Sequence, residues 1–174
     1  MLFQGNYRIE SNRMPSWNYA GKGSYHATFN TKEGIPWLGR IQTDVMELSL
    51  EGLIVVKELL KTPLIRCYVE LDEWVVMPNH VHAIFHIDPS KIPDDEKKVD
   101  ELEDGDEAAR ARLIKRSLGS MLGQIKSKCT KEIHACVNDA FEWQPRYHDR
   151  IIRSEKQLVN TRRYIKNNIA NWRT

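Results

Sequence analysis

The sequence has little cysteine and no long hydrophobic run. No apolar stretch approaches the roughly 20 residues that a helix needs to cross a bilayer, so we expect no membrane partner. The three cysteines, Cys67, Cys129 and Cys136, are an odd set without paired spacing, which favours a reducing, cytoplasmic setting over a disulfide framework. The N-terminus lacks the charged head and apolar run of a signal peptide.

A second Cys-x-x-Cys or His-x-x-x-His element is also missing. Cys129, His134 and Cys136 are close enough in sequence to suggest part of a zinc site. Structural zinc sites take four ligands from two such elements, so the spacing does not favour this interpretation.

The net charge is only +2, but it is unevenly distributed. The segment 94–107 is strongly acidic, whereas the segment 146–173 is strongly basic. A basic C-terminal region suggests a polyanionic partner. Scattered lysine and arginine residues are equally typical of a solvated helix face, so charge alone leaves both interpretations open.

The length suits one domain spanning residues 1–174. Residues 1–18 read as an irregular lead-in, and residues 89–106 as an acidic, loop-like insertion. Between and after them we predict strands over 24–31, 65–76, 80–87 and 147–153, and helices over 48–60, 107–131 and from 154 onwards. Pro78-Asn79 forms the turn between two antiparallel strands.

Two of the predicted helices carry clear signals. The helix over 48–60 places Leu50, Leu53 and Leu60 at three- and four-residue steps and should stop before Pro63. The last helix begins with a capping box, in which Ser154 and Gln157 satisfy backbone donors reciprocally. Its core-facing residues are expected to be Leu158, Ile165, Ile169 and Trp172.

Strands and helices in this order indicate an α+β domain. We predict a ferredoxin-like, RRM-like antiparallel sheet with helices mainly on one face, plus a C-terminal helix.

The stretch from Val75 to Ile87 contains two histidines, His80 and His82, separated by one apolar residue. On a strand these side chains point the same way, about 6–7 Å apart, close enough for two imidazoles to bind one ion. The opposite face, with Val81, Ala83, Phe85 and Ile87, should anchor the strand in the core. A polar outer face without a metal is the alternative interpretation of an isolated pair.

Tyr164 and Asn168 lie four residues apart and should sit side by side on the last helix. A tyrosine hydroxyl has a pKa of about 10, so it is a weak nucleophile at neutral pH. It becomes competent when a metal polarises the phosphate under attack. A tyrosine on an amphipathic helix is also commonly a packing residue.

Four pieces of the chain resemble the HUH-type single-tyrosine transposases of bacterial insertion sequences, nearest to the REP-associated tyrosine transposase branch. Each piece is weak alone, but their order and spacing carry the resemblance. They are the segments 23–29, 75–82, 143–153 and 164–168.

The resemblance implies a DNA endonuclease and strand transferase. The histidine pair His80 and His82, helped by Asn168, would coordinate Mg²⁺ or Mn²⁺. Tyr164 would attack a phosphodiester in single-stranded DNA, expected to be a hairpin, giving a 5′-phosphotyrosine link and a free 3′-hydroxyl. Members of the family include monomers and homodimers, so the oligomeric state stays open. The candidate DNA contacts are Lys126, Arg146, Arg150, Arg153, Arg162 and Arg163.

The sequence departs from the family pattern at Ile169, where members often have proline after the Asn-Asn pair. The acidic segment around 94–106 is also unusual beside a DNA-binding body. Two alternatives remain at this stage: a domesticated hairpin-binding protein without turnover, and a histidine-triad-like nucleotide hydrolase. The second alternative would require a histidine at position 84, which is Ile84 here.

Overall fold

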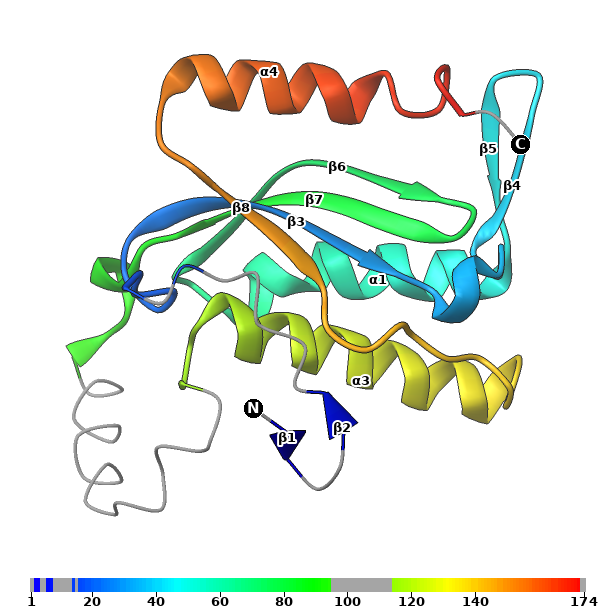
Figure 1. Cartoon of the computed structure of the whole chain (residues 1–174), viewed down its shortest axis with the longest axis horizontal. Helices are drawn as coiled ribbons and strands as arrows, with labels where there is room; N and C mark the ends of the chain where they lie inside the picture. The colour runs from blue at the N-terminus through cyan, green and yellow to red at the C-terminus, as the bar shows by residue number, and fades with distance from the viewer. Residues whose placement is uncertain (1, 4–5, 8–13, 15, 95–113, 173–174) are drawn as a thin grey trace.

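The computed structural model describes residues 2–3, 6–7, 14, 16–94 and 114–172. At its centre lies a four-stranded antiparallel sheet in the order β6-β7-β3-β8. The strands are β3 (Gly23–Asn30), β6 (Val69–Met77), β7 (His80–Ile87) and β8 (His148–Ile152). Helices α1 (Leu50–Ile65) and α3 (Leu118–Cys136) cover one face, and α4 (Glu155–Lys166) lies over the other (Figure 1).

Along the chain, the sheet strands and their two covering helices follow the order strand, helix, strand, strand, helix, strand. Together with the sheet order, this is the ferredoxin-like arrangement. The predicted α+β class is therefore confirmed. The C-terminal helix packs on the sheet face that the first two helices leave uncovered (Figure 1).

The core lies between the sheet and the pair α1 and α3. On β3 the side chains of Tyr25, Ala27 and Phe29 are fully buried and alternate with partly exposed residues. Val81, Ala83, Phe85 and Ile87 of β7 are buried in the same cluster, as the period of two predicted. The alternation leaves the polar residues of β3 and β7 on the face beneath α4.

Two short hairpins were not predicted. Strands β1 (Leu2–Phe3) and β2 (Asn6–Tyr7) pair within the segment expected to be irregular. Strands β4 (Gly39–Gln42) and β5 (Val45–Leu48) form the second hairpin, following the short 3-10 turn η1 (Lys32–Gly34). At its tip Thr43 and Asp44 both have positive φ, the conformation of a tight two-residue hairpin turn.

The helix predicted over 48–60 is α1, which is longer than expected and buries a different face from the one predicted. It continues through Pro63, whose missing N–H affects only the last turn before the end at Ile65. Leu50, Leu53 and Leu60 are 62%, 51% and 49% exposed, so the predicted apolar face is the outer one. Gly52 faces the body instead, because a Cβ there would lie 2.2 Å from the Leu38 carbonyl oxygen.

The helix predicted over 107–131 is α3, which begins later, at Leu118, and ends later, at Cys136. Residues 114–117 are not helical; Arg116 has φ +60°, and Ser117 then caps the helix by accepting from the Ser120 N–H. Residues 107–113 lie outside the described part of the chain. The strand predicted over 65–76 begins at Val69, because α1 occupies Ile65.

Helix α4 begins where the capping box predicted, but it ends at Lys166. Ser154 Oγ accepts from the Gln157 N–H, while Gln157 Oε1 accepts from the Arg153 N–H, one residue before the cap. Ile169 and Trp172 therefore lie beyond the helix, in turns rather than on its packed face, contrary to prediction.

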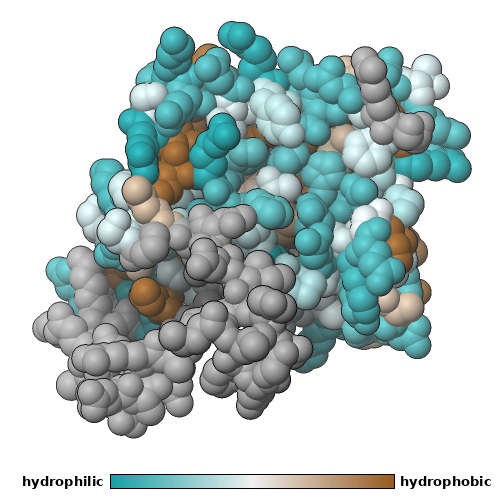
Figure 2. All heavy atoms as spheres, viewed as in Figure 1, coloured by the Kyte–Doolittle hydropathy of each residue, from teal (hydrophilic) through white to brown (hydrophobic). Residues whose placement is uncertain are grey.

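The acidic segment begins with the 3-10 turn η2 (Pro89–Lys91), and its residues 95–106 lie outside the described part. No helix among the described residues is long and apolar enough to span a membrane. In Figure 2 the visible face of the molecule is mostly hydrophilic, with apolar atoms in separate small patches.

Candidate active site beneath the tyrosine helix

His80 and His82 point from β7 toward the face covered by α4, as the strand period predicted. Their ring centroids are 4.7 Å apart and the rings are nearly perpendicular. His82 is buried, at 6% exposure, whereas His80 is partly exposed. The pair therefore shares one rigid strand, with one ring deep and one near the surface.

The tautomer of His80 follows from its neighbour Asn79. The Asn79 amide donates from Nδ2 to the Gly34 carbonyl at 3.1 Å, which leaves Oδ1 as the acceptor facing His80. His80 Nδ1 lies 2.7 Å from that oxygen and must donate to it. The Nε2 lone pair of His80 is thus free for a ligand.

His82 is held by two residues of the neighbouring strand. Its Nδ1 lies 2.8 Å from Thr28 Oγ1 and 3.2 Å from His26 Nε2. Nδ1 is therefore occupied by residues of β3, and Nε2 is the ring nitrogen directed toward α4, where it meets the Tyr164 hydroxyl. Sequence reasoning missed His26 and Thr28, although both lie on the partly exposed face of β3; the pairing of Thr28 with His82 joins residues 54 apart in the chain.

Burial keeps the histidine cluster neutral. It lowers the pKa of His82 to about 3, with His80 and His26 adding to the effect. Burial, together with the nearby Arg150, lowers the pKa of His26 to about 4, and burial also lowers the pKa of His80. Neutral imidazole is the form that binds metal ions.

Tyr164 is brought to the same cluster by α4. Its hydroxyl lies 3.4 Å from His82 Nε2, and its ring meets the His82 ring edge-on at 5.3 Å between centroids. The side chain is 52% exposed, so its hydroxyl faces both the histidine and solvent. Residues 82 positions apart in the chain thus form one site.

A small apolar cluster docks α4 on the sheet. Ile165 is fully buried and packs with Ile84 of β7 and Ile152 of β8, and Val75 and Leu158 complete the cluster. Because Ile84 lies between His82 and His86 on this face, it fills the position where a histidine-triad hydrolase would need a histidine. The structure therefore gives no support to that alternative.

The structure places Asn168 after the end of α4. Its Nδ2 donates to the Tyr164 carbonyl at 3.3 Å, and its N–H donates to the Ile165 carbonyl. Trp172 follows, with its ring centroid 5.8 Å from that of His80. The tail after α4 thus returns over the histidine pair, and the role of Asn168 as a metal ligand stays a prediction.

A cleft of about 860 Å³ opens beside Tyr164, between α4 and the strands β3 and β8. Arg150 and Arg153 line it on one side, and His26 and His82 line it near the tyrosine. The two arginines outnumber the one carboxylate of the lining, Asp149, so the cleft beside the Tyr164 hydroxyl suits a polyanion.

The six residues predicted to contact DNA lie in different surroundings. Arg150 and Arg153 line the cleft, with Arg153 also lying 5.8 Å from the Trp17 ring. Lys126 donates to the Gln144 and Arg146 carbonyls, and Arg162 is paired with Asp72. Arg146 and Arg163 are exposed. Contact with DNA stays a prediction for all six.

The donor set fits a divalent ion only in part. Within the described part of the chain, no three His, Cys, Asp or Glu residues are grouped to hold a metal. Two imidazoles that bind an ion through Nε2 would leave several coordination positions open, as catalytic metal sites do. The zinc site suggested by Cys129, His134 and Cys136 is not formed, because Cys129 is buried in the core and His134 bonds the Phe141 carbonyl.

No protein-family model matches the chain. It is 27% identical over 173 residues to an uncharacterised protein of Haemophilus influenzae, covering 97% of this chain and 92% of that protein. A solved structure of a protein assigned provisionally as a transposase of Deinococcus radiodurans R1 is 17% identical. The match covers 91% of this chain and 97% of that chain, and its TM-score of 0.45 indicates a distant likeness.

A second solved structure, of a REP-associated tyrosine transposase bound to a REP hairpin, is the more informative comparison. It is 21% identical, with a TM-score of 0.59, covering 94% of this chain and 80% of that chain. The chain therefore shares the α+β fold of a REP-associated tyrosine transposase.

Proposed function

We propose that this protein is a metal-dependent single-stranded DNA nuclease and strand transferase of the transposase type, with Tyr164 as the nucleophile. The observation that carries the proposal is the placement of the Tyr164 hydroxyl 3.4 Å from His82 Nε2, beside His80. The shared fold with a hairpin-bound tyrosine transposase supports the same function.

In the reaction, the Tyr164 oxygen attacks a phosphodiester phosphorus. The bond from the oxygen to phosphorus forms as the bond to the 3′ oxygen breaks, giving a 5′-phosphotyrosine and a free 3′-hydroxyl. The phenolic proton passes to solvent, which reaches the half-exposed side chain, and the leaving 3′ oxygen takes up a proton from solvent. Reversal by another 3′-hydroxyl rejoins strands without ATP, because the phosphodiester energy is kept in the link.

His80 and His82 would hold Mg²⁺ or Mn²⁺ through Nε2, with Asn79 and Thr28 fixing the ring orientations. The ion would polarise the phosphate and neutralise charge that develops on it. Arg150 and Arg153 would bind and orient the DNA, because they line the cleft along which the phosphates would run.

Covalent trapping tests this proposal. The protein is incubated with Mn²⁺ and a 5′- or 3′-labelled single-stranded hairpin taken from the flanks of its gene, then denatured. We expect label downstream of the cut to stay on the wild-type protein, and to be lost in Tyr164→Phe, in His80→Ala/His82→Ala and without metal. Tyr147→Phe serves as the matched control, because Tyr147 packs against the core rather than at the histidine pair.

The outcomes separate the two remaining functions. A metal-dependent link that needs Tyr164 supports the nuclease. Tight hairpin binding without any link, across several flanking hairpins, would instead support a binding protein that has lost turnover.

A further inference from the structure

A bulge in β6 presents two adjacent carboxylates to α4. The pairing of β6 with β7 shifts between Leu71 and Trp74, so that Asp72 and Glu73 lie opposite the single residue Ile84. Bulges of this kind redirect side chains away from the regular alternation. Here they give the edge strand two acidic groups beneath the tyrosine helix.

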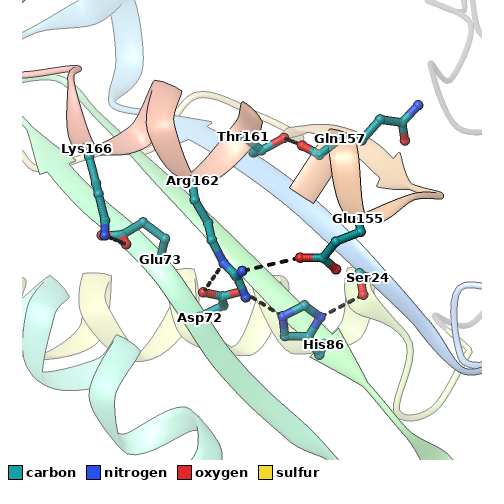
Figure 3. Close-up of polar contacts among 9 residues, drawn as sticks. All are labelled: Ser24, Asp72, Glu73, His86, Glu155, Gln157, Thr161, Arg162 and Lys166. Carbon is teal, nitrogen blue, oxygen red and sulfur yellow. Dashed lines mark hydrogen bonds and ion pairs between the residues drawn. The ribbon is translucent and has the colours of Figure 1, made fainter. Parts of the chain in front are cut away.

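Each carboxylate pairs with a cation of α4. Arg162 binds Asp72 in two places, with Nε 3.0 Å from Oδ1 and Nη2 2.8 Å from Oδ2 (Figure 3). Lys166 Nζ lies 3.2 Å from Glu73 Oε2. The two cations are four residues apart, hence neighbours on one flank of the helix.

Asp72 is also held from the sheet side. His86 Nε2 lies 2.8 Å from Asp72 Oδ2, and His86 Nδ1 lies 2.7 Å from Ser24 Oγ. A chain of hydrogen bonds therefore runs from β3 through β7 and β6 into α4 (Figure 3). Burial raises the pKa of Asp72, but the bonds and charges of Arg162 and His86 lower it below its usual value, so it is ionised.

Ser24, His86 and Asp72 have the residue types of a hydrolase triad, but their surroundings argue against that role. None of the three lines the cleft beside Tyr164. Arg162 occupies both oxygens of Asp72, and Asp72 is only 15% exposed. The chain of bonds connects structural elements instead.

The position of these contacts on α4 gives them a consequence. Successive helical residues are about 100° apart, so Ile165 faces the sheet while Arg162 and Tyr164 lie on opposite flanks. Arg162 is on the β6 side, and Tyr164 is on the cleft side. The apolar contacts of Ile165 alone would let the helix roll about its axis, and a roll would swing the Tyr164 hydroxyl away from His82.

We propose that Asp72 is a positioning residue: by clamping Arg162, it fixes the rotation of α4 and so holds the Tyr164 hydroxyl at the histidine pair. This inference rests on the proposed function. Misplacement of a nucleophile by about 1 Å costs up to about a hundredfold in rate, so the clamp should affect turnover rather than binding.

Single-turnover cleavage of the hairpin with Asp72→Asn and Arg162→Lys tests the clamp. We expect the cleavage rate at saturating DNA to decrease by about tenfold to a hundredfold. In Asp72→Asn, which leaves every candidate DNA contact and metal ligand in place, the half-saturating concentrations of DNA and Mn²⁺ should be unchanged. Asp72→Glu should recover most of the rate, and the double variant Asp72→Asn/Arg162→Lys should be no slower than the slower single variant.

A matched control is Glu132→Gln, which removes an ion pair with Lys57 between α1 and α3 on the far face of the sheet. It should leave the cleavage rate intact. Hydrogen exchange gives an independent measurement: residues 155–166 should exchange faster in Asp72→Asn, whereas β3 and β7 should not.

Two failures are distinguishable. An active wild type with an unchanged cleavage rate in Asp72→Asn would overturn the positioning role alone. A wild type that forms no covalent link would overturn the proposed function on which the positioning role depends.

Discussion

Two hydrogen bonds from side chains decide what the histidine pair can do. Asn79 and Thr28 contact the Nδ1 atoms of His80 and His82, so both Nε2 atoms face the site. Neither contact changes the charge of the rings. They fix orientation, and orientation decides whether two imidazoles can share one ion.

We predict that Thr28→Val weakens binding of Mn²⁺ by about ten- to a hundredfold, because His82 loses a hydrogen-bond partner that orients its ring. Isothermal titration with Mn²⁺ measures the affinity. Thr130→Val is the control, since the Thr130 hydroxyl bonds the Lys126 carbonyl within α3. Equal affinities for wild type and Thr28→Val would contradict the orienting role of Thr28.

For individual residues, the sequence predicted relations between side chains of the same strand. The shared face of His80 and His82 follows from the period of two, which is local. His26 and Thr28 could not be assigned, because their contact with His82 depends on the pairing of β3 with β7, which are separated by α1 and β6. The two carbonyl partners of the Lys126 ammonium could not be predicted either, because a charge in the sequence does not reveal what it binds.

Among the elements, α4 is held to the sheet by few contacts. Helix α3 is tied to the loop before β8 by Lys126, whose ammonium donates to the Gln144 and Arg146 carbonyls at 2.7 and 2.8 Å. Burial lowers the pKa of Lys126 to about 8, so it stays mostly protonated at neutral pH.

We predict that Lys126→Met lowers the free energy of unfolding by about 1 kcal/mol, because two carbonyls lose a charged donor in a partly solvated place. Urea unfolding measures the change. Lys128→Met on the same helix, where the side chain is exposed, should be within error of wild type. A wild-type stability in Lys126→Met would show that these bonds contribute nothing measurable.

The Asp72 clamp should depend on pH. Its folded-state pKa lies below the ordinary value of 3.8, so it stabilises the fold above that value and loses the contribution as the pH falls through the folded pKa. We predict that wild type is more stable than Asp72→Asn near neutrality and that the difference shrinks below about pH 4. Urea unfolding of both proteins across this range measures it; a constant difference would contradict the pairing.

The helices show which signals are local. The start of α4 was predictable, because the Ser154 cap is encoded in four residues. The buried face of α1 was not, since leucines at three- and four-residue steps mark a stripe without saying which side meets the core. Gly52 decides the question through its close approach to Leu38, a contact 14 residues away in the chain.

For the whole molecule, the sheet separates two environments. The face under α1 and α3 is a closed apolar core, and the face under α4 holds the polar site. The α+β topology was predictable from element order alone. The packing of Leu158 and Ile165 of α4 against the sheet was predicted, but the ion pairs of α4 with β6 were not, because they depend on a bulge in an edge strand and on the matched spacing of two cations.

The closed core has a chemical consequence for the three free thiols. Cys129 is buried beneath the sheet, where burial raises the pKa of its thiol to about 12, whereas Cys67 and Cys136 are exposed. We predict that iodoacetamide alkylates Cys67 and Cys136 in the native protein and reaches Cys129 only in urea. Peptide mass spectrometry identifies the modified sites. Rapid native alkylation of Cys129 would contradict the packing of α3.

The central claim is that Tyr164 is the nucleophile, and the most direct measurement is the site of the DNA adduct. After trapping with Mn²⁺ and hairpin DNA, nuclease digestion should leave a short nucleotide on the protein. We predict a phosphate-linked nucleotide on the proteolytic peptide that contains Tyr164, and on no other peptide. An adduct on another tyrosine, on serine or on histidine would contradict it.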